Sequence, residues 1–156
     1  MPNWLHLIVN LVYHLGLAIW IGGMIALGAL VAPALFRALP RQDAGALFGT
    51  TLRRFARVRV AALSATIVAA AAKYLLWEHT GSVWIAIRWA ALGFMAAAVL
   101  YEIAVLERAL EARRVHLTPA MAEDHPERRA FQALHKRAEG LMKASLLAAL
   151  AAMLLS

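Results

Sequence analysis

Three polar residues recur at four-residue intervals in a segment that is otherwise suited to lipid. His6, Asn10 and His14 fall on one face of a helix, because residues four apart in sequence lie one turn apart. The same face continues with small residues, namely Ala18, Gly22 and Ala26. Polar side chains in a spanning helix turn toward the interior of a bundle, and small residues let another helix or a flat cofactor approach the backbone. His14 is therefore the first candidate for a functional residue.

Two basic residues are predicted to reach the depth of His14. His14 lies about 15 Å along its span, and Arg88 lies about 10 Å along a later one, at 1.5 Å per residue. Lys73, near the end of its span, reaches the same region. We expect a cationic group of His14, Lys73 and Arg88, with Asn10 and Tyr13 nearby and no carboxylate partner at that depth. Such a group suits an anionic ligand, such as haem propionates, a lipid head group or a small oxyanion.

A purely structural role is the alternative for each of these residues. His14 would donate a hydrogen bond to a carbonyl of a neighbouring helix, and Arg88 and Lys73 would snorkel to lipid phosphates. Gly22 and Gly23 would only permit close packing. The structural role is preferred for Lys73 and the two glycines, both roles stay open for Arg88, and the functional role is preferred for His14 because ionisable residues within spans are rare.

The composition predicts that these residues are embedded in a membrane. The chain has 156 residues, of which 63% are hydrophobic, and a mean hydropathy of +0.66, more apolar than a soluble domain of this size can bury. No charged residue occurs before Arg37, and about 20 apolar residues suffice to cross a bilayer. The absence of cysteine excludes disulfides, iron–sulfur clusters and thiolate metal sites.

We predict an all-α, polytopic membrane protein, a four-helix transmembrane bundle with cytoplasmic helical extensions, in a single integral membrane domain over 1–156. The spans are expected at approximately 5–36, 60–77, 83–106 and 140–156, with loops at 37–59 and 107–139. The last span is short, with 13 uncharged residues after Lys143. The basic end of 107–139 is predicted to form an amphipathic helix that either lies on the inner leaflet or packs against the first loop.

The basic residues predict the orientation. All but Lys73 and Arg88 of the 16 Lys and Arg residues flank the two loops. The positive-inside rule then places both loops in the cytoplasm and both termini outside, in the cell inner (plasma) membrane. An aromatic belt at the outer interface is expected from Trp4, Trp77, Trp84 and Trp89. Because the charge is explained by topology, we expect the lipid bilayer, a second copy or a membrane subunit as partner, and no nucleic acid.

Other polar residues are assigned structural roles. Glu102, near the cytoplasmic edge, is predicted to pair with Arg57 or Arg59 and so fix the second span against the third. A metal site is a weak alternative for a group without a known ligand spacing, namely His116, Glu123, Asp124, His125 and His135. The chain lacks the G-x-G-x-x-G, Walker, H-E-x-x-H and G-x-S-x-G motifs of soluble enzymes.

The run "YHLGLAIWIGGMIALGALVAPALFRALPRQDAGALFGTTLRRFARV", residues 13–58, resembles the transmembrane-protein-205-like family of small four-helix membrane proteins. The shared pattern is W-x-G-G followed by P-x-L-F and a Gly-containing amphipathic loop. The spacing of His14, Trp20, Gly22 and Gly23 is also similar to the first helix of copper resistance protein D and of the membrane-bound, haem-containing protoporphyrinogen oxidase. The second resemblance implies haem b, with His14 as its iron ligand and Arg88 in place of a lysine. An arginine cannot coordinate iron as that lysine is proposed to do, but it can bind a propionate.

A copper site is less favoured, because only Met24 and Met95 could meet inside the bundle and Cu(I) prefers soft ligands. Three functions therefore remain open. The first is a haem- or porphyrin-binding protein, active in electron transfer or porphyrin oxidation or not an enzyme at all. It would use His14 on the iron, Arg88 and Lys73 on the propionates, and Trp20, Gly22 and Asn10 around the ring. The second is non-enzymatic transport or sensing of a small solute or metal, and the third is a structural or assembly subunit.

Overall fold

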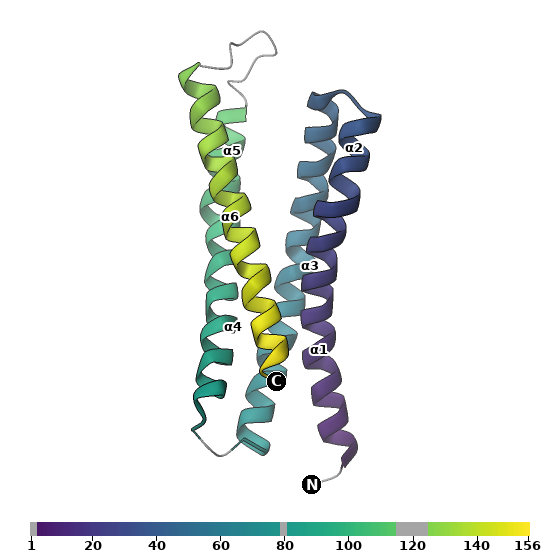
Figure 1. Ribbon diagram of the computed structural model, residues 1–156, viewed down its shortest axis with the longest axis vertical. Coiled ribbons are helices and arrows are strands. Elements are labelled where there is room, and N and C mark those ends of the chain that lie inside the picture. The colour runs from purple at the N-terminus through teal and green to yellow at the C-terminus, as the bar shows by residue number, and fades with distance from the viewer. Residues whose placement is uncertain (1–2, 79–80, 115–124) are drawn as a thin grey trace.

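The computed structural model describes residues 3–78, 81–114 and 125–156, and every element in these ranges is a helix. The all-helical class expected from the sequence is therefore confirmed. The elements follow one another as long rods, drawn from purple to yellow in Figure 1. Such rods are the expected outcome in lipid, because a helix satisfies its own backbone hydrogen bonds and needs no water to do so.

The first rod consists of three consecutive helical segments without a break. These are α1 (Asn3–Ile25), a π-helical turn η1 (Ala26–Val31) and α2 (Ala32–Ala38). In η1 the Ala32 N–H donates to Leu27 O, five residues back instead of four. Pro33 follows directly and has no N–H to donate to the preceding turn. The wider π-helical turn therefore lies where the regular pattern of helical hydrogen bonds is interrupted. The rod covers the predicted first span, 5–36, and passes it at both ends.

The second rod, α3 (Arg41–Leu76), begins after a turn at Leu39 and Pro40. Pro40 cannot continue α2, and Asp43 in the first turn of α3 lies where a negative charge favours a helix start. The segment 37–59, expected as a loop, is thus helical except at this turn. The predicted boundaries of this loop follow the charged residues. Charged residues do not interrupt the backbone hydrogen bonds of a helix, so α3 continues through them.

The third rod consists of α4 (Val83–Tyr101), a second π-helical turn η2 (Glu102–Leu106) and α5 (Glu107–Arg114). Ser82 caps its start by accepting a hydrogen bond from the Trp84 N–H at 3.3 Å. The continuation of the third span beyond 106 is as predicted. In η2 the Glu107 N–H donates to Glu102 O, again five residues back.

The last helix, α6 (Pro126–Leu154), begins with proline in its first turn and His125 as its cap, and it runs without interruption through 140–156. Its amphipathic first half packs along α5, and its second half packs along α4 and α1. The helix expected to enter the fourth span is therefore present.

Among the described residues, three stretches are long and apolar enough to cross a membrane, by length and composition: Asn3–Ala38, Arg41–Leu76 and Val83–Arg113. The sequence predicted a fourth at 140–156, and α6 is not among the three. Large hydrophobic side chains on the rods are widely exposed, such as Leu30 at 68% and Leu75 at 70%. A membrane environment explains this exposure, because lipid is a good solvent for such surfaces.

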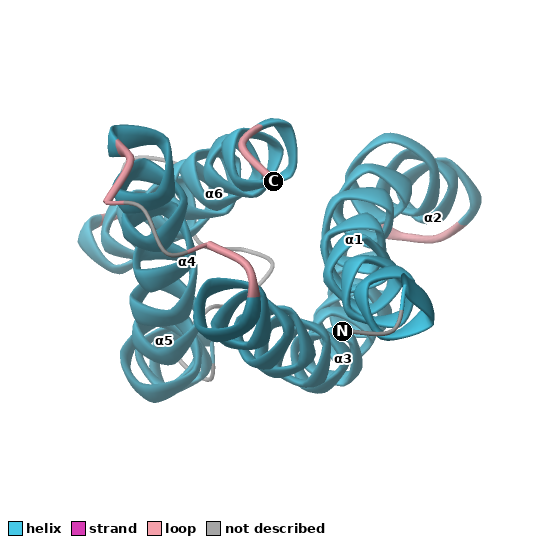
Figure 2. Cartoon of the chain, turned by 90° about the horizontal axis from the view of Figure 1, so that it is seen from below, coloured by secondary structure: helices cyan, strands magenta, loops and turns pink. Residues whose placement is uncertain are grey.

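The rods form two hairpins, α1 with α3 and α4 with α6, seen side by side in Figure 1 and end-on in Figure 2. We call the lower end in Figure 1 the tryptophan end, after Trp4, Trp77 and Trp84, and the upper end the arginine end, after Arg41, Arg53 and Arg54. The C-terminal end of α6 stops short of the tryptophan end. The buried core joins both hairpins through Leu17, Trp20, Leu63, Leu92, Met95 and Ala149.

Two glycines of α1 allow it to approach α3 closely. A Cβ atom on Gly16 would lie 2.1 Å from Thr66 Oγ1 and 2.7 Å from Ala62 O, and one on Gly23 would lie 2.1 Å from the Phe55 ring. A Cβ on Gly22 would meet nothing within 4 Å. Of the glycine doublet, Gly23 therefore has the expected packing role. Gly16 has it as well, and there a side chain would collide with the Ala62 backbone oxygen of α3. The sequence analysis did not identify Gly16.

We expect Gly16→Ala to destabilise the protein by about 2 kcal/mol, because the added methyl group must push α1 away from the α3 backbone. Gly22→Ala, with open space around it, is the matched control and is expected to leave stability unchanged or slightly raised. Thermal unfolding in a mild detergent measures both. Equal unfolding midpoints for the two variants would contradict the close approach of α1 and α3.

Candidate functional site

His14 is held in one orientation by two hydrogen bonds. Its Nδ1 lies 2.8 Å from the Asn10 carbonyl oxygen and its Nε2 lies 2.9 Å from the Ser156 hydroxyl. Because a carbonyl oxygen only accepts, Nδ1 must carry a proton and donate it. In neutral His14 the lone pair is then on Nε2, which can accept from the Ser156 hydroxyl in place of the bond that this hydroxyl donates to the Met153 carbonyl oxygen. Metal-ligating histidines are prepared in the same way, with the distal nitrogen anchored to a carbonyl or carboxylate.

Tyr13, beside His14, ties α1 to the end of α6. Its ring is fully buried, and its hydroxyl donates to the Ala152 carbonyl oxygen over 2.7 Å. Together with the contact between His14 and Ser156, this bond anchors the last turn of α6 on two consecutive residues of α1. The end of α6 and Ser156 are thus part of the site.

Lys73 of α3 lies against the same tyrosine. Its ammonium group is 5.0 Å from the Tyr13 ring centroid, and the side chain is only 6% exposed. No carboxylate of the described residues lies within ion-pair distance of it. The structure therefore brings His14 and Lys73 to one aromatic ring, with a ring-to-ring distance of 5.3 Å between Tyr13 and His14. Tyr13 thus lies in contact with both residues, and their predicted group with Arg88 stays a prediction.

Arg88 has a carboxylate partner, which corrects the expectation of an unpaired cationic group. Its guanidinium holds both carboxylate oxygens of Glu78, with Nη1 at 2.8 Å from Oε1, and it is 1% exposed. Glu78 follows the end of α3, so the sequence placed it outside the span. The chain turns back immediately into α4 and carries the carboxylate to Arg88. The Arg88 hydrogen bond holds the pKa of the Glu78 carboxyl below its ordinary value, against the opposing effect of burial.

A second interior ion pair lies further toward the arginine end. Arg59 of α3 and Glu102 of η2 are 2.8 Å apart, which confirms the predicted pairing and selects Arg59 as the partner. The Arg59 guanidinium carbon also lies 5.4 Å from the Trp20 ring. Trp20, expected to line the ligand site, is 1% exposed and stacks here, six residues along α1 from His14. Its Nε1 has no hydrogen-bond partner in the described part of the chain.

The other residues on the predicted polar and small-residue face of α1 differ in their contacts. Asn10 bonds through its side chain to His6 Nε2 at 2.7 Å, and the His6 ring meets the Trp77 ring edge-on at 4.9 Å. Gly22 is exposed and approaches none of these residues. The polar residues of this face are therefore connected by hydrogen bonds, and its small residues Ala18 and Gly22 are exposed.

The weaker metal sites gain no support from the described residues. His125 caps α6, His135 stacks on Phe131, and no group of three or more His, Cys, Asp or Glu that could hold a metal occurs in the described ranges. His116, Glu123 and Asp124 lie outside those ranges. Met24 and Met95 are both in the buried core.

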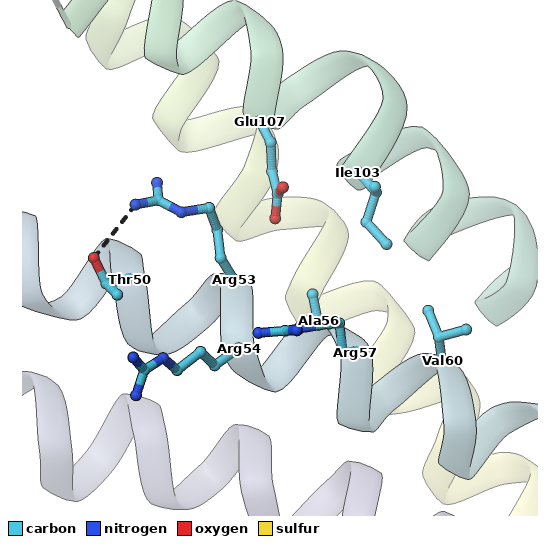
Figure 3. Close-up of a pocket in the computed structure, with 8 residues that line it drawn as sticks. All are labelled: Thr50, Arg53, Arg54, Ala56, Arg57, Val60, Ile103 and Glu107. Atoms are coloured by element: carbon cyan, nitrogen blue, oxygen red, sulfur yellow. Dashed lines mark hydrogen bonds between the residues drawn. The ribbon is translucent and has the colours of Figure 1, made fainter.

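Sequence reasoning missed a cavity of about 550 Å³ at the arginine end, between α3 and the η2–α5 segment. Figure 3 shows Arg53, Arg54 and Arg57 on one wall, with Glu107 and Ile103 opposite. The three arginines had been used only to orient the protein. Their spacing of three and four residues, which places them along one side of a helix, was the available signal.

These features define a helical membrane protein with two interior ion pairs and a His–Tyr–Lys cluster at the tryptophan end. The family model described as "Domain of unknown function (DUF4149)" matches residues 15–116, and the chain belongs to this family. Searches of curated proteins and of solved structures found no match. The matched segment includes Lys73, both ion pairs and the cavity, whereas His14, Tyr13 and Asn10 lie just before it.

We expect Glu78→Gln to lower stability by about 3 kcal/mol at pH 7, because it leaves the Arg88 charge buried without a counter-charge. The pKa of Glu78 is lowered in the folded state, so its contribution is complete well above pH 4.5, the ordinary value, and is lost as the pH falls below it. The unfolding midpoints of wild type and variant should therefore converge on acidification.

Glu139→Gln is the matched control for this prediction, because Glu139 pairs with Lys143 on the exposed side of α6. It should unfold like the wild type at pH 7. A Glu78→Gln variant as stable as Glu139→Gln would contradict an essential counter-charge at this position.

Proposed function

We propose that this protein binds haem b, or a related anionic porphyrin, at the tryptophan end of the membrane bundle, with His14 as the iron ligand. The proposal rests on the hydrogen bond from His14 Nδ1 to the Asn10 carbonyl oxygen. This bond leaves Nε2, which carries the lone pair, as the nitrogen that can coordinate iron. Only the Ser156 hydroxyl now occupies that nitrogen. Haem would supply one-electron chemistry or a route for electrons from a bound porphyrin.

Lys73 is the residue that would bind a haem propionate. The sequence analysis had assigned this role to both Lys73 and Arg88. Arg88 is already neutralised by Glu78, so the group of Lys73, Glu78 and Arg88 carries one positive charge that lacks a counter-ion. An uncompensated charge in a membrane interior is costly, and one propionate would balance it. The distant resemblance to the haem-containing oxidase supports His14 as the iron ligand.

The proposed setting is the inner membrane, with four spans and both termini outside. The positive-inside rule supports this orientation, because the basic residues gather at the arginine end. In this arrangement α6 is the fourth span, and its end at His14 places the porphyrin site in the outer half of the bundle. The resemblance to the transmembrane-protein-205-like family supports four spans.

An absorption spectrum of protein purified in mild detergent tests the haem proposal. We expect a Soret band in the wild type, or after addition of haemin, that is lost in His14→Ala and kept in the matched control His6→Ala. Lys73→Gln should retain the band but release haem roughly tenfold more readily, as expected for the loss of a charge-assisted bond. Wild-type protein that is colourless and ignores added haemin would overturn the proposal.

A structural or assembly role is the second candidate, because Gly22 and Ala18 present small residues on an exposed face of α1. Small residues at such positions suit contact with another helix. Gly22→Leu should then dissociate a complex in mild detergent, measured by light scattering, while His14→Ala leaves it intact. A strictly monomeric wild-type protein would argue against this role.

A further inference from the structure

The cavity at the arginine end combines a polar half with an apolar half. Thr50, Arg53, Arg54 and Arg57 follow one another along α3, and Val60 continues the same wall. In Figure 3 the guanidinium groups lie toward the Thr50 end, and Val60 lies toward Ile103 at the other end. The distance from Thr50 to Val60 along α3 is about 15 Å at the rise of a helix. The cavity is thus amphipathic along its length.

The arginines of this wall are not equally engaged. Arg53 donates to Thr50 Oγ1 at 3.3 Å and lies 3.6 Å from Glu111 across the cavity mouth. Arg54 and Arg57 have no acceptor among the described residues, and in Figure 3 both side chains extend in the same direction from α3. Two guanidinium groups three residues apart on a helix can each present a pair of N–H donors to the oxygens of one anion.

The opposite wall carries one acidic side chain. Glu107 projects into the cavity from α5, without an ion pair among the described residues, and lies across from Arg53. The lining therefore has three positive charges against one negative charge. An anion would avoid Glu107 and sit between Arg54 and Arg57, with the apolar end at Val60 and Ile103 beside it.

We propose that this cavity binds a phosphate ester, with Arg54 and Arg57 as the phosphate ligands. Phosphate suits two adjacent arginines, because its tetrahedral oxygens accept several charge-assisted hydrogen bonds at once. The apolar half suits the organic part of the ester. An anionic phospholipid and a small soluble phosphate ester share this chemistry. The site is independent of His14, at the other end of the bundle.

The test uses the full chain in a neutral detergent and three probes: phosphatidylglycerol, glycerol phosphate and inorganic phosphate. We expect at least the phosphatidylglycerol to raise the unfolding midpoint and to remain bound in native mass spectrometry. Arg54→Gln and Arg57→Gln should each raise its Kd roughly tenfold. Glu107→Gln, which removes the only repulsive charge of the lining, should lower the Kd.

Arg137→Gln is the matched control, since Arg137 is exposed on α6 away from the cavity. Arg54 and Arg57 are also exposed, so their variants should fold, which the midpoint without probe verifies. Binding of the lipid alone supports a lipid site, and binding of glycerol phosphate with equal loss in both arginine variants supports a soluble ester. If no probe binds, or if Arg54→Gln and Arg57→Gln bind as Arg137→Gln does, the proposal is overturned.

Discussion

The ion pair between Arg59 and Glu102 joins the two helical hairpins in the interior of the protein. Arg59 belongs to α3 and Glu102 to η2, so the pair bridges the two hairpins midway along α3. A charge that is buried away from water must be paired, so each residue fixes the position of the other. The position of Trp20 depends on this pair, because its ring packs against the Arg59 guanidinium. The register of α3 against η2 also positions the walls of the cavity.

The second ion pair acts at the opposite end of the same helix. Glu78 and Arg88 close the short connection between α3 and α4 and neutralise most of the charge there. What remains is Lys73, whose ammonium rests on Tyr13 instead of a carboxylate. Among the described residues, Lys73 is thus a cation without a counter-ion near His14, and Arg54 and Arg57 are without an acceptor at the cavity of the arginine end. Both proposals for ligands follow from these residual charges.

Much of the architecture could be predicted from the sequence because it depends on local properties. The uncharged run before Arg37 requires a lipid-exposed helix, and the prolines at 33, 40 and 126 mark a π-helical turn or a helix start. The pairing of Glu102 with Arg57 or Arg59 also followed from depth, and the structure selected Arg59. The segment 37–59, expected as a cytoplasmic loop, is helical except at the turn of Leu39 and Pro40, because the charge pattern indicates where a chain meets water and not where helical hydrogen bonding ends.

The candidate sites depend less on local properties. From the sequence, His14, Lys73 and Arg88 could be assigned to a common depth, since depth follows from counting residues along a helix. Only the tertiary structure decided that Glu78 folds back onto Arg88, that Ser156 reaches His14, and that Gly16 rather than Gly22 meets α3. These contacts join segments far apart in the chain or depend on the rotation of a helix about its axis. Residue spacing determines the height of a side chain along a span, but the direction in which it points is set by the packing of its neighbours.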